Sequence, residues 1–189
     1  MINNAGIGVG GEVRDLSLDH WRRVVDVNLW GVIHGVMAAY PAMVRQRAGH
    51  VVNIASLAGL GASPTMTPYA MTKHAVVGLS TSLRAEAADL GVRVSVVCPG
   101  FVQSGIYDAA TVVNARKELV MARVPFRPIP APRAAAAILR GVEKNRAIIV
   151  FPFYARLLWG LRRLHPSLLA PLEARIVRDF RAVRTTPEP

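Results

Sequence analysis

Two segments in the first half of the chain have the pattern of helices. Over residues 18–47 they return every three or four positions, which predicts an amphipathic helix, and Ser17 is a suitable N-cap for it. A second helical segment is expected over residues 68–90, because its proline suits a first helical turn and Gly91 suits the position after a last turn. The two segments predict two long helices separated by about twenty residues.

Continuous apolar runs separate and follow these helices. Residues 50–55 and 92–98 are rich in valine and isoleucine, which is typical of strands buried on both faces of a parallel sheet. A helical pattern over 133–144 and an apolar run over 147–151 extend the alternation. The order of helix and strand predicts an α/β fold, in which ligands bind beyond the carboxyl ends of the strands.

The stretch from residue 104 to residue 132 is less regular and rich in proline. Its apolar side chains have two interpretations, a lid over a ligand or a helix packed on the core. These side chains are Tyr107, Val112, Val113, Leu119, Val120, Met121 and Phe126.

The pattern changes again after Phe151. Residues 153–164 and 168–183 are each amphipathic at helical spacing, and the segment 151–189 carries seven arginines and three acidic residues, a net charge of +4. In the first helix the expected apolar stripe comprises Tyr154, Leu157, Leu158, Leu161 and Leu164, and in the second Leu169, Leu172, Ile176 and Phe180. We therefore divide the chain into a sheet domain, 1–150, and a basic helical extension, 151–189.

Two interpretations of this extension remain open. Basic amphipathic helices with tryptophan and tyrosine are typical of membrane-surface segments. The alternative is a tail that packs its apolar stripe on the core or on another subunit.

Length and composition favour a single cytoplasmic globular domain. The chain has 189 residues, of which 52% are hydrophobic and 19% charged. No apolar run reaches the roughly 18 residues that span a bilayer, and no basic-then-apolar signal opens the chain. Cys98 is the single cysteine, which excludes an internal disulfide and fits a reducing compartment.

The net charge of +11 favours an anionic partner, such as lipid headgroups or an acidic substrate. Nucleic acid is not expected, because the chain has no helix-turn-helix, zinc-ligand spacing or aromatic-rich basic sheet. The five histidines show no metal-ligand spacing, and we expect no metal site.

The candidate chemistry centres on a tyrosine and a lysine. Tyr69 and Lys73 are four residues apart and share one face of the predicted helix, while Ser56 follows the strand 50–55. A cation close to a phenol favours the phenolate and lowers its pKa, which would let the tyrosine exchange protons near neutral pH.

Other motifs flank these residues in a fixed order. The sequence Asn-Asn-Ala-Gly begins at Asn3, Asn28 follows, and Pro99-Gly100 comes directly after the strand 92–98. In order and spacing the chain closely resembles the short-chain dehydrogenase/reductase family over residues 1–150. The resemblance implies a partial doubly wound, Rossmann-like parallel sheet that binds NAD or NADP.

The resemblance also implies roles for single residues. Tyr69 would be the catalytic acid/base, and Lys73 would lower its pKa and hold the nicotinamide ribose. Ser56 would hydrogen-bond the substrate oxygen, and Asn28 would anchor a water in a proton relay. Besides Tyr69 and Lys73, the implied cofactor-binding residues are Asn4, Ala5, Gly6, Pro99, Gly100, Val102 and Ser104.

The start of the chain departs from the family pattern. Family members carry a glycine-rich phosphate-binding turn, and the residue that selects NAD or NADP, before the Asn-Asn-Ala-Gly motif. Here the motif starts at Asn3, so either Met1 is an internal methionine or the gene is genuinely shortened. Gly6, Gly8 and Gly11 fit G-x-G-x-x-G, but a full strand before them and an apolar helix pattern after them are lacking, so a loop is expected.

The sequence therefore predicts an NAD(P)-dependent oxidoreductase that interconverts a secondary alcohol and a ketone, with a hydrophobic substrate. The alternative is a catalytically impaired fragment that acts as a membrane-surface or subunit-interaction module. In the family the helices near 28–47 and 69–90 often form a dimer contact, so a homo-oligomer is expected. The extension 151–189 adds the prospect of peripheral membrane contact.

Overall fold

A parallel sheet with helices on both faces organises the molecule. The computed structural model describes residues 1–124 and 126–185. Four strands form this sheet in the order β1-β3-β4-β6, all parallel. Their bounds are β1 Ile2–Asn3, β3 Gly49–Ile54, β4 Val92–Pro99 and β6 Ile148–Phe151.

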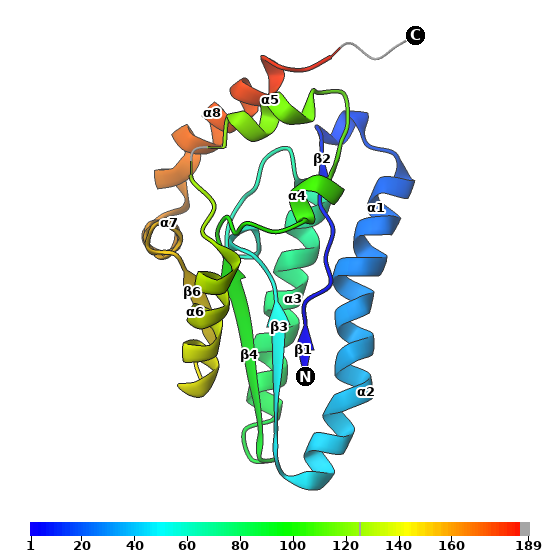
Figure 1. Cartoon of the computed structure of the whole chain (residues 1–189), viewed down its shortest axis with the longest axis vertical. Coiled ribbons are helices and arrows are strands. Elements are labelled where there is room, and N and C mark those ends of the chain that lie inside the picture. The colour runs from blue at the N-terminus through cyan, green and yellow to red at the C-terminus, as the bar shows by residue number, and fades with distance from the viewer. Residues whose placement is uncertain (125, 186–189) are drawn as a thin grey trace.

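Two long helical segments cover one face of the sheet, and a third helix covers the other (Figure 1). The first is continuous through α1 (Leu18–Val25), a π-helical turn η2 (Asp26–Trp30) and α2 (Gly31–Gln46). The second is α3 (Thr67–Glu86), and the opposite face is covered by α6 (Ala131–Glu143). The predicted α/β fold is confirmed.

The core lies on both faces of the sheet because successive strand residues point to opposite sides. Val51 and Val94 pack with Val36 and Val76 of the two long helices. On the other face Val52, Val97, Ile149 and Phe151 pack with Ala134 of α6. This two-sided burial explains why the strands read as unbroken apolar runs.

Helix α3 ends earlier than predicted, at Glu86 instead of residue 90. Residues 87–90 form turns, in which the Leu90 amide donates to the Ala87 carbonyl at 3.1 Å. Gly91 then has φ +75° and lies against the backbone of Arg47, where a side chain would have no room. The chain needs these residues to reverse into β4, so glycine serves the turn and not the end of the helix.

The segment 104–132 contains α4 (Ile106–Ala109), β5 (Thr111–Val112) and α5 (Lys117–Ala122). Strand β5 pairs in parallel with β2 (Val9–Gly10) to form a second, two-stranded sheet. The seven apolar side chains named for this segment are half-buried. The segment itself runs over the carboxyl end of the main sheet (Figure 1).

The extension forms α7 (Phe153–Leu164), the 3-10 turn η4 (Pro166–Leu169) and α8 (Ala170–Arg181). In α8 the predicted apolar side faces the protein, with Phe180 buried. In α7 the predicted stripe is wrong in part, since Leu157 and Leu164 are exposed and Ala155 is buried. Ala155 belongs to the core cluster that contains Val150 of β6, so the opposite side of α7, which carries Leu157 and Leu164, faces outward.

The continuous helix Leu18–Gln46 is long and apolar enough to span a bilayer by length and composition alone. The sequence pattern does not predict such a segment, because no unbroken apolar run reaches that length. Core helices of globular proteins pass the same test, and this one packs on α3 and β3, so the feature is weak evidence for a spanning segment.

Candidate active site

Ser56 lies where β3 ends and the 3-10 turn η3 (Leu57–Gly59) begins. Its backbone is extended, with φ −169°, and its hydroxyl accepts a hydrogen bond from the Ala58 amide at 3.1 Å. Serine is a favoured N-cap because its side chain replaces a missing helical acceptor. This cap fixes the Ser56 side chain at the carboxyl end of the sheet, where ligands of α/β folds bind.

Helix α3 brings Tyr69 and Lys73 to the same place. The Lys73 ammonium lies 5.5 Å from the centroid of the Tyr69 ring, one helical turn away. Lys73 is only 3% exposed, and its Nζ donates to the Ile54 carbonyl at the end of β3, at 2.9 Å. The strand end and the helix start thus hold the three candidate groups together.

Burial dominates the electrostatics of this pair. It raises the pKa of Tyr69, and the hydrogen bond from Ser56 only partly opposes this. It also lowers the pKa of Lys73 to about 8. The expected lowering of the Tyr69 pKa by Lys73 is not found in this arrangement, because burial of the phenol is the largest influence on its pKa.

Asn28 is fully buried in the π-helical turn and clamps the segment after β1. Its Oδ1 accepts from the Ile7 amide at 2.8 Å, and its Nδ2 donates to the Ile7 carbonyl at 3.0 Å. π-turns re-aim single side chains, and they are frequent at functional sites. The geometry assigns Asn28 a clear role in positioning the loop that carries Gly6.

Thr72 was missed by the sequence analysis. Its buried hydroxyl donates to the Tyr69 carbonyl at 2.8 Å and accepts from Asn28 Nδ2 at 3.3 Å. It thereby links α3 to the π-helical turn directly beside Tyr69. Its position between Tyr69 and Lys73 was the feature of the sequence from which this role could have been predicted.

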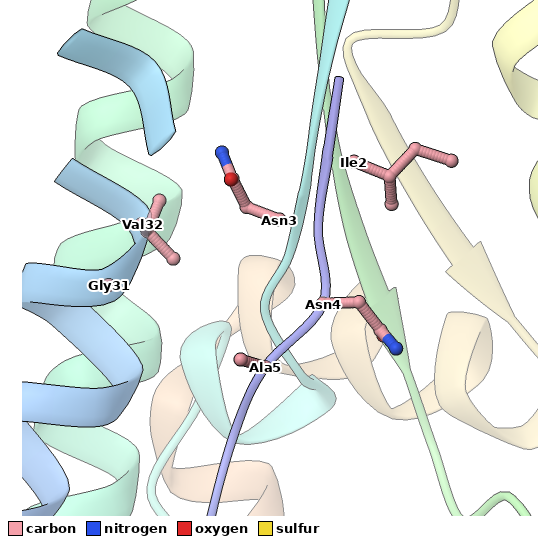
Figure 2. A pocket seen from close by; sticks show the side chains of 6 residues that line it. All are labelled: Ile2, Asn3, Asn4, Ala5, Gly31 and Val32. Carbon is pink, nitrogen blue, oxygen red and sulfur yellow. The ribbon is translucent and has the colours of Figure 1, made fainter. Parts of the chain in front are cut away.

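The Asn-Asn-Ala-Gly motif runs from β1 toward the same site. Figure 2 shows Asn3 pointing to the helix side of the strand, while Asn4 points to the other side. A pocket of about 170 Å³ is lined by Ile2, Asn3, Asn4, Ala5, Gly31 and Val32. Asn4 and Ala5 are exposed, and Gly6 lies between Lys73 and Asn28, so the three predicted residues follow one open edge.

Asn3 has a structural role that differs from that of its neighbour. Its Nδ2 donates to Asn53 Oδ1 at 2.7 Å, and Asn53 in turn donates to Ser80 at 3.0 Å. This buried polar chain ties β1 to β3 and α3.

Pro99 is the last residue of β4, Gly100 and Val102 follow it, and all three are half-buried, whereas Ser104 is exposed. The Phe101 amide donates to the Tyr154 hydroxyl at 2.7 Å, and the Val102 amide donates to the Tyr107 hydroxyl at 3.3 Å. Tyr154 packs against Gly100, where any side chain would collide with its ring. Two phenols from different elements therefore hold the loop after β4.

The structure also places the glycines of the first loop and the single cysteine. Gly6, Gly8 and Gly11 lie in the loop around β2, and the next element is the three-residue 3-10 turn η1 (Val13–Asp15) and not a helix that begins within the glycines, which confirms the loop prediction. Cys98 is fully buried, and burial raises the pKa of its thiol to about 12. Such a thiol stays protonated and unreactive.

The residues present fit a nicotinamide cofactor. An ammonium has three donors, and within residues 1–124 and 126–185 the Lys73 ammonium makes one hydrogen bond, to Ile54. A buried cation with spare donors suits the hydroxyl groups of a ribose. Asn4 and Ala5 after β1, and Ser104 after β4, are exposed, so a ligand can reach them.

Comparison with known proteins finds dehydrogenases and other oxidoreductases. The family model described as short chain dehydrogenase matches residues 1–112. The chain is 34% identical over 183 residues to the putative oxidoreductase SadH of Mycobacterium tuberculosis, covering 94% of this chain and 66% of that protein. It is 35% identical over 126 residues to the 3-oxoacyl-[acyl-carrier-protein] reductase FabG of Staphylococcus aureus, covering 67% of this chain and 50% of the reductase.

Solved structures give the same result. A short-chain dehydrogenase from Streptomyces avermitilis superposes with a TM-score of 0.77 at 26% identity, covering 94% of this chain and 69% of that one. A short chain dehydrogenase from Burkholderia cenocepacia in complex with NADP gives 0.75 at 25% identity, covering 90% and 69%.

The chain spans about half the length of the curated relatives it matches, 50% in the case of the Staphylococcus reductase. The family model nevertheless covers more than half of the chain, and the serine, tyrosine and lysine lie together at the end of the sheet. The chain belongs to the short-chain dehydrogenase family, a lineage of NAD(P)-dependent oxidoreductases.

Proposed function

We propose that this protein acts in the NAD(P)-dependent interconversion of a secondary alcohol and a ketone. The observation that carries the proposal is the convergence of Ser56, Tyr69 and Lys73 at the carboxyl end of β3. Relatives that bind such cofactors support it, among them a 3-oxoacyl-[acyl-carrier protein] reductase of Brucella melitensis with bound NAD, which is 32% identical.

The chain's own residues would handle the proton. A bound nicotinamide would supply or accept the hydride. Tyr69 would donate its phenolic proton to the developing alkoxide during reduction, and Ser56 would donate a hydrogen bond to the same oxygen. Lys73, with a pKa of about 8, would return a proton toward the tyrosine at physiological pH.

Asn28 and Thr72 would keep this constellation in place. Asn28 holds the Ile7 backbone, and Thr72 bonds to both Asn28 and the backbone of Tyr69. The proposed water relay at Asn28 would start from this fixed amide.

A hydrophobic substrate is the best fit to the surroundings. Phe101 stacks near Tyr107 and Phe126, with ring centroids 6.4 Å and 6.5 Å away. Phe126 also stacks on Tyr154 at 4.0 Å. Tyr107 lies close enough to Tyr69 to raise its pKa further, which supports an aromatic wall beside the proposed reacting group.

We propose further that the chain forms a homo-oligomer in the cytoplasm and contacts a membrane surface through 151–189. Trp30, Met37 and Met71 are exposed on η2, α2 and α3, which supports packing of these helices against a second copy. The arginines of the extension support the membrane contact.

Fluorescence titration of the 189-residue protein with NADPH and NADH tests the proposal. Micromolar binding of either nucleotide would support it and identify the cofactor, after which hydrophobic ketones can be screened for turnover. Absence of binding up to millimolar nucleotide would refute the oxidoreductase activity of this chain and favour the non-catalytic interaction module.

A further inference from the structure

The apolar side chains of α7 lie on the side of the helix that faces away from the protein. Phe153, Leu157 and Leu164 are 76%, 52% and 78% exposed, and Gly160 between them is exposed as well. Residues spaced by three, four or seven positions share a helix face. These four residues therefore form one continuous strip, the α7 outer face, which the rest of the described chain leaves uncovered.

The opposite side of α7 is already used. Ala155 is fully buried, and Tyr154 accepts the hydrogen bond from the Phe101 amide. Leu158 and Leu161 are half-buried. Helix α7 therefore packs on the protein through its inner side, and its outer face is not needed for that packing.

The charges beside the outer face have one sign. Helix α7 contains no acidic residue and three arginines. Arg162 is paired with Glu173 of α8 at 2.7 Å. Arg156 and Arg163 are exposed on the flank of the strip, and Arg156 Nε donates to the Val150 carbonyl at 2.8 Å, which leaves the terminal nitrogens of its guanidinium as further donors. The Arg163 guanidinium lies 5.3 Å from the centroid of the Trp159 ring. This cation–π contact holds the positive charge beside the outer face.

We infer that the α7 outer face docks on an anionic lipid surface, with Phe153, Leu157 and Leu164 in the acyl boundary and Arg156 and Arg163 among the headgroups. An apolar strip bordered by arginine matches the two parts of such an interface. A second copy fits less well, because a symmetric contact would bring the same arginines together. This assignment sharpens, and rests on, the membrane contact proposed for 151–189.

The contact would connect the lipid surface to the site. The inner side of α7 carries Tyr154, which holds the loop after Gly100 and stacks on Phe126. A lipid surface bound at the α7 outer face would therefore lie one helix away from the aromatic wall.

Vesicle co-sedimentation of the full chain tests the inference. We expect binding to phosphatidylcholine vesicles that contain phosphatidylserine, and at least tenfold weaker binding to phosphatidylcholine alone or at high salt, since salt screens the arginines. Leu164→Ser and Arg163→Gln should each weaken binding by roughly tenfold. Both side chains are exposed, so the fold should survive.

Helix α6 supplies the matched controls. Leu139 is 56% exposed and is followed by the exposed Arg140. Leu139→Ser and Arg140→Gln should leave vesicle binding unchanged. Equal losses in both pairs of variants, or no binding of the wild-type chain, would overturn the inference.

Sedimentation velocity without lipid tests whether a second copy of the chain, and not a lipid surface, covers the outer face. If the wild-type chain self-associates and Leu164→Ser abolishes this, the outer face is a contact between copies and the lipid assignment is wrong. The nucleotide titration is independent of both experiments, so a failure of membrane docking and a failure of the oxidoreductase proposal are separable.

Discussion

The Lys73 ammonium lies 5.5 Å from the centre of the Tyr69 ring and donates to the Ile54 carbonyl at 2.9 Å. One side chain thus joins the first turns of α3 to the end of β3. The same burial that fixes the lysine lowers its pKa to about 8 and raises the pKa of the neighbouring tyrosine. Folding therefore brings the two side chains together and removes both from water.

Tyr69→Phe should remove turnover while leaving nucleotide affinity nearly unchanged. The substitution deletes only the proton-donating hydroxyl, and loss of a general acid typically costs about 10²- to 10⁴-fold in rate. Steady-state kinetics with a hydrophobic ketone and the NADPH and NADH titrations measure the two effects. Tyr40→Phe on α2 is the matched control, and wild-type turnover in Tyr69→Phe would show that another group transfers the proton.

Stability should rise with pH between about 8 and 10 because of Lys73. In this window the unfolded lysine is protonated and the folded one is not, so the unfolded state binds more protons and alkalinity favours folding. Above about pH 10 the gain should reverse, because the raised pKa of Tyr69 keeps it protonated in the folded state alone.

Urea unfolding at pH 7 and pH 10 measures this dependence. Lys73→Met should remove the rise and stabilise the protein at pH 7 by on the order of 3 kcal/mol, the free energy that corresponds to the shift. Lys144→Met, at the exposed end of α6, should change neither quantity. A wild-type protein whose stability is flat over this range would contradict the burial of a charged lysine.

Gly59→Ala should destabilise the protein by about 1–3 kcal/mol. A Cβ at Gly59 would lie 2.5 Å from the Lys73 carbonyl oxygen, so η3 would have to move away from α3 and take Ser56 with it. Gly78→Ala in the middle of α3 meets nothing within 4 Å and should stabilise by about 0.5–1 kcal/mol through helix propensity. Chemical unfolding of both variants would show opposite signs, and a neutral Gly59→Ala would refute the close contact.

Glu12→Gln should loosen α8 at neutral pH. Glu12 accepts from Arg181 at 2.7 Å and from Arg14 at 2.6 Å, and these bonds lower its pKa. Its stabilising contribution is present above the unfolded pKa and is lost as acid protonates the folded carboxylate, so wild-type α8 should loosen in the same way at low pH.

Hydrogen exchange of the α8 amides measures this docking. Asp19→Asn, which breaks an exposed pair with Arg22 on α1, is the control and should leave α8 unchanged. Equal exchange in wild type and Glu12→Gln would mean that other contacts hold the helix, such as the packing of Phe180 and the Arg184–Asp15 pair at 2.6 Å.

The order of the elements and the three groups of the site could be predicted from the sequence alone. Valine-rich runs predicted β3 and β4 because strands buried on both faces are apolar throughout. The spacing of Tyr69 and Lys73 predicted a shared helix face, and the position of Ser56 after a strand placed it at the carboxyl edge. These are local signals, carried by neighbours in the chain.

The tertiary structure decided what depends on contacts between distant residues. The early end of α3 follows from the turn that Gly91 makes against Arg47, and the role of Thr72 follows from its bond to Asn28. The outward face of α7 follows from the fit of Ala155 against the end of β6. Helical period gives the relative angles of side chains, but only packing partners decide which side of a helix is buried, and burial in turn sets the pKa of Lys73.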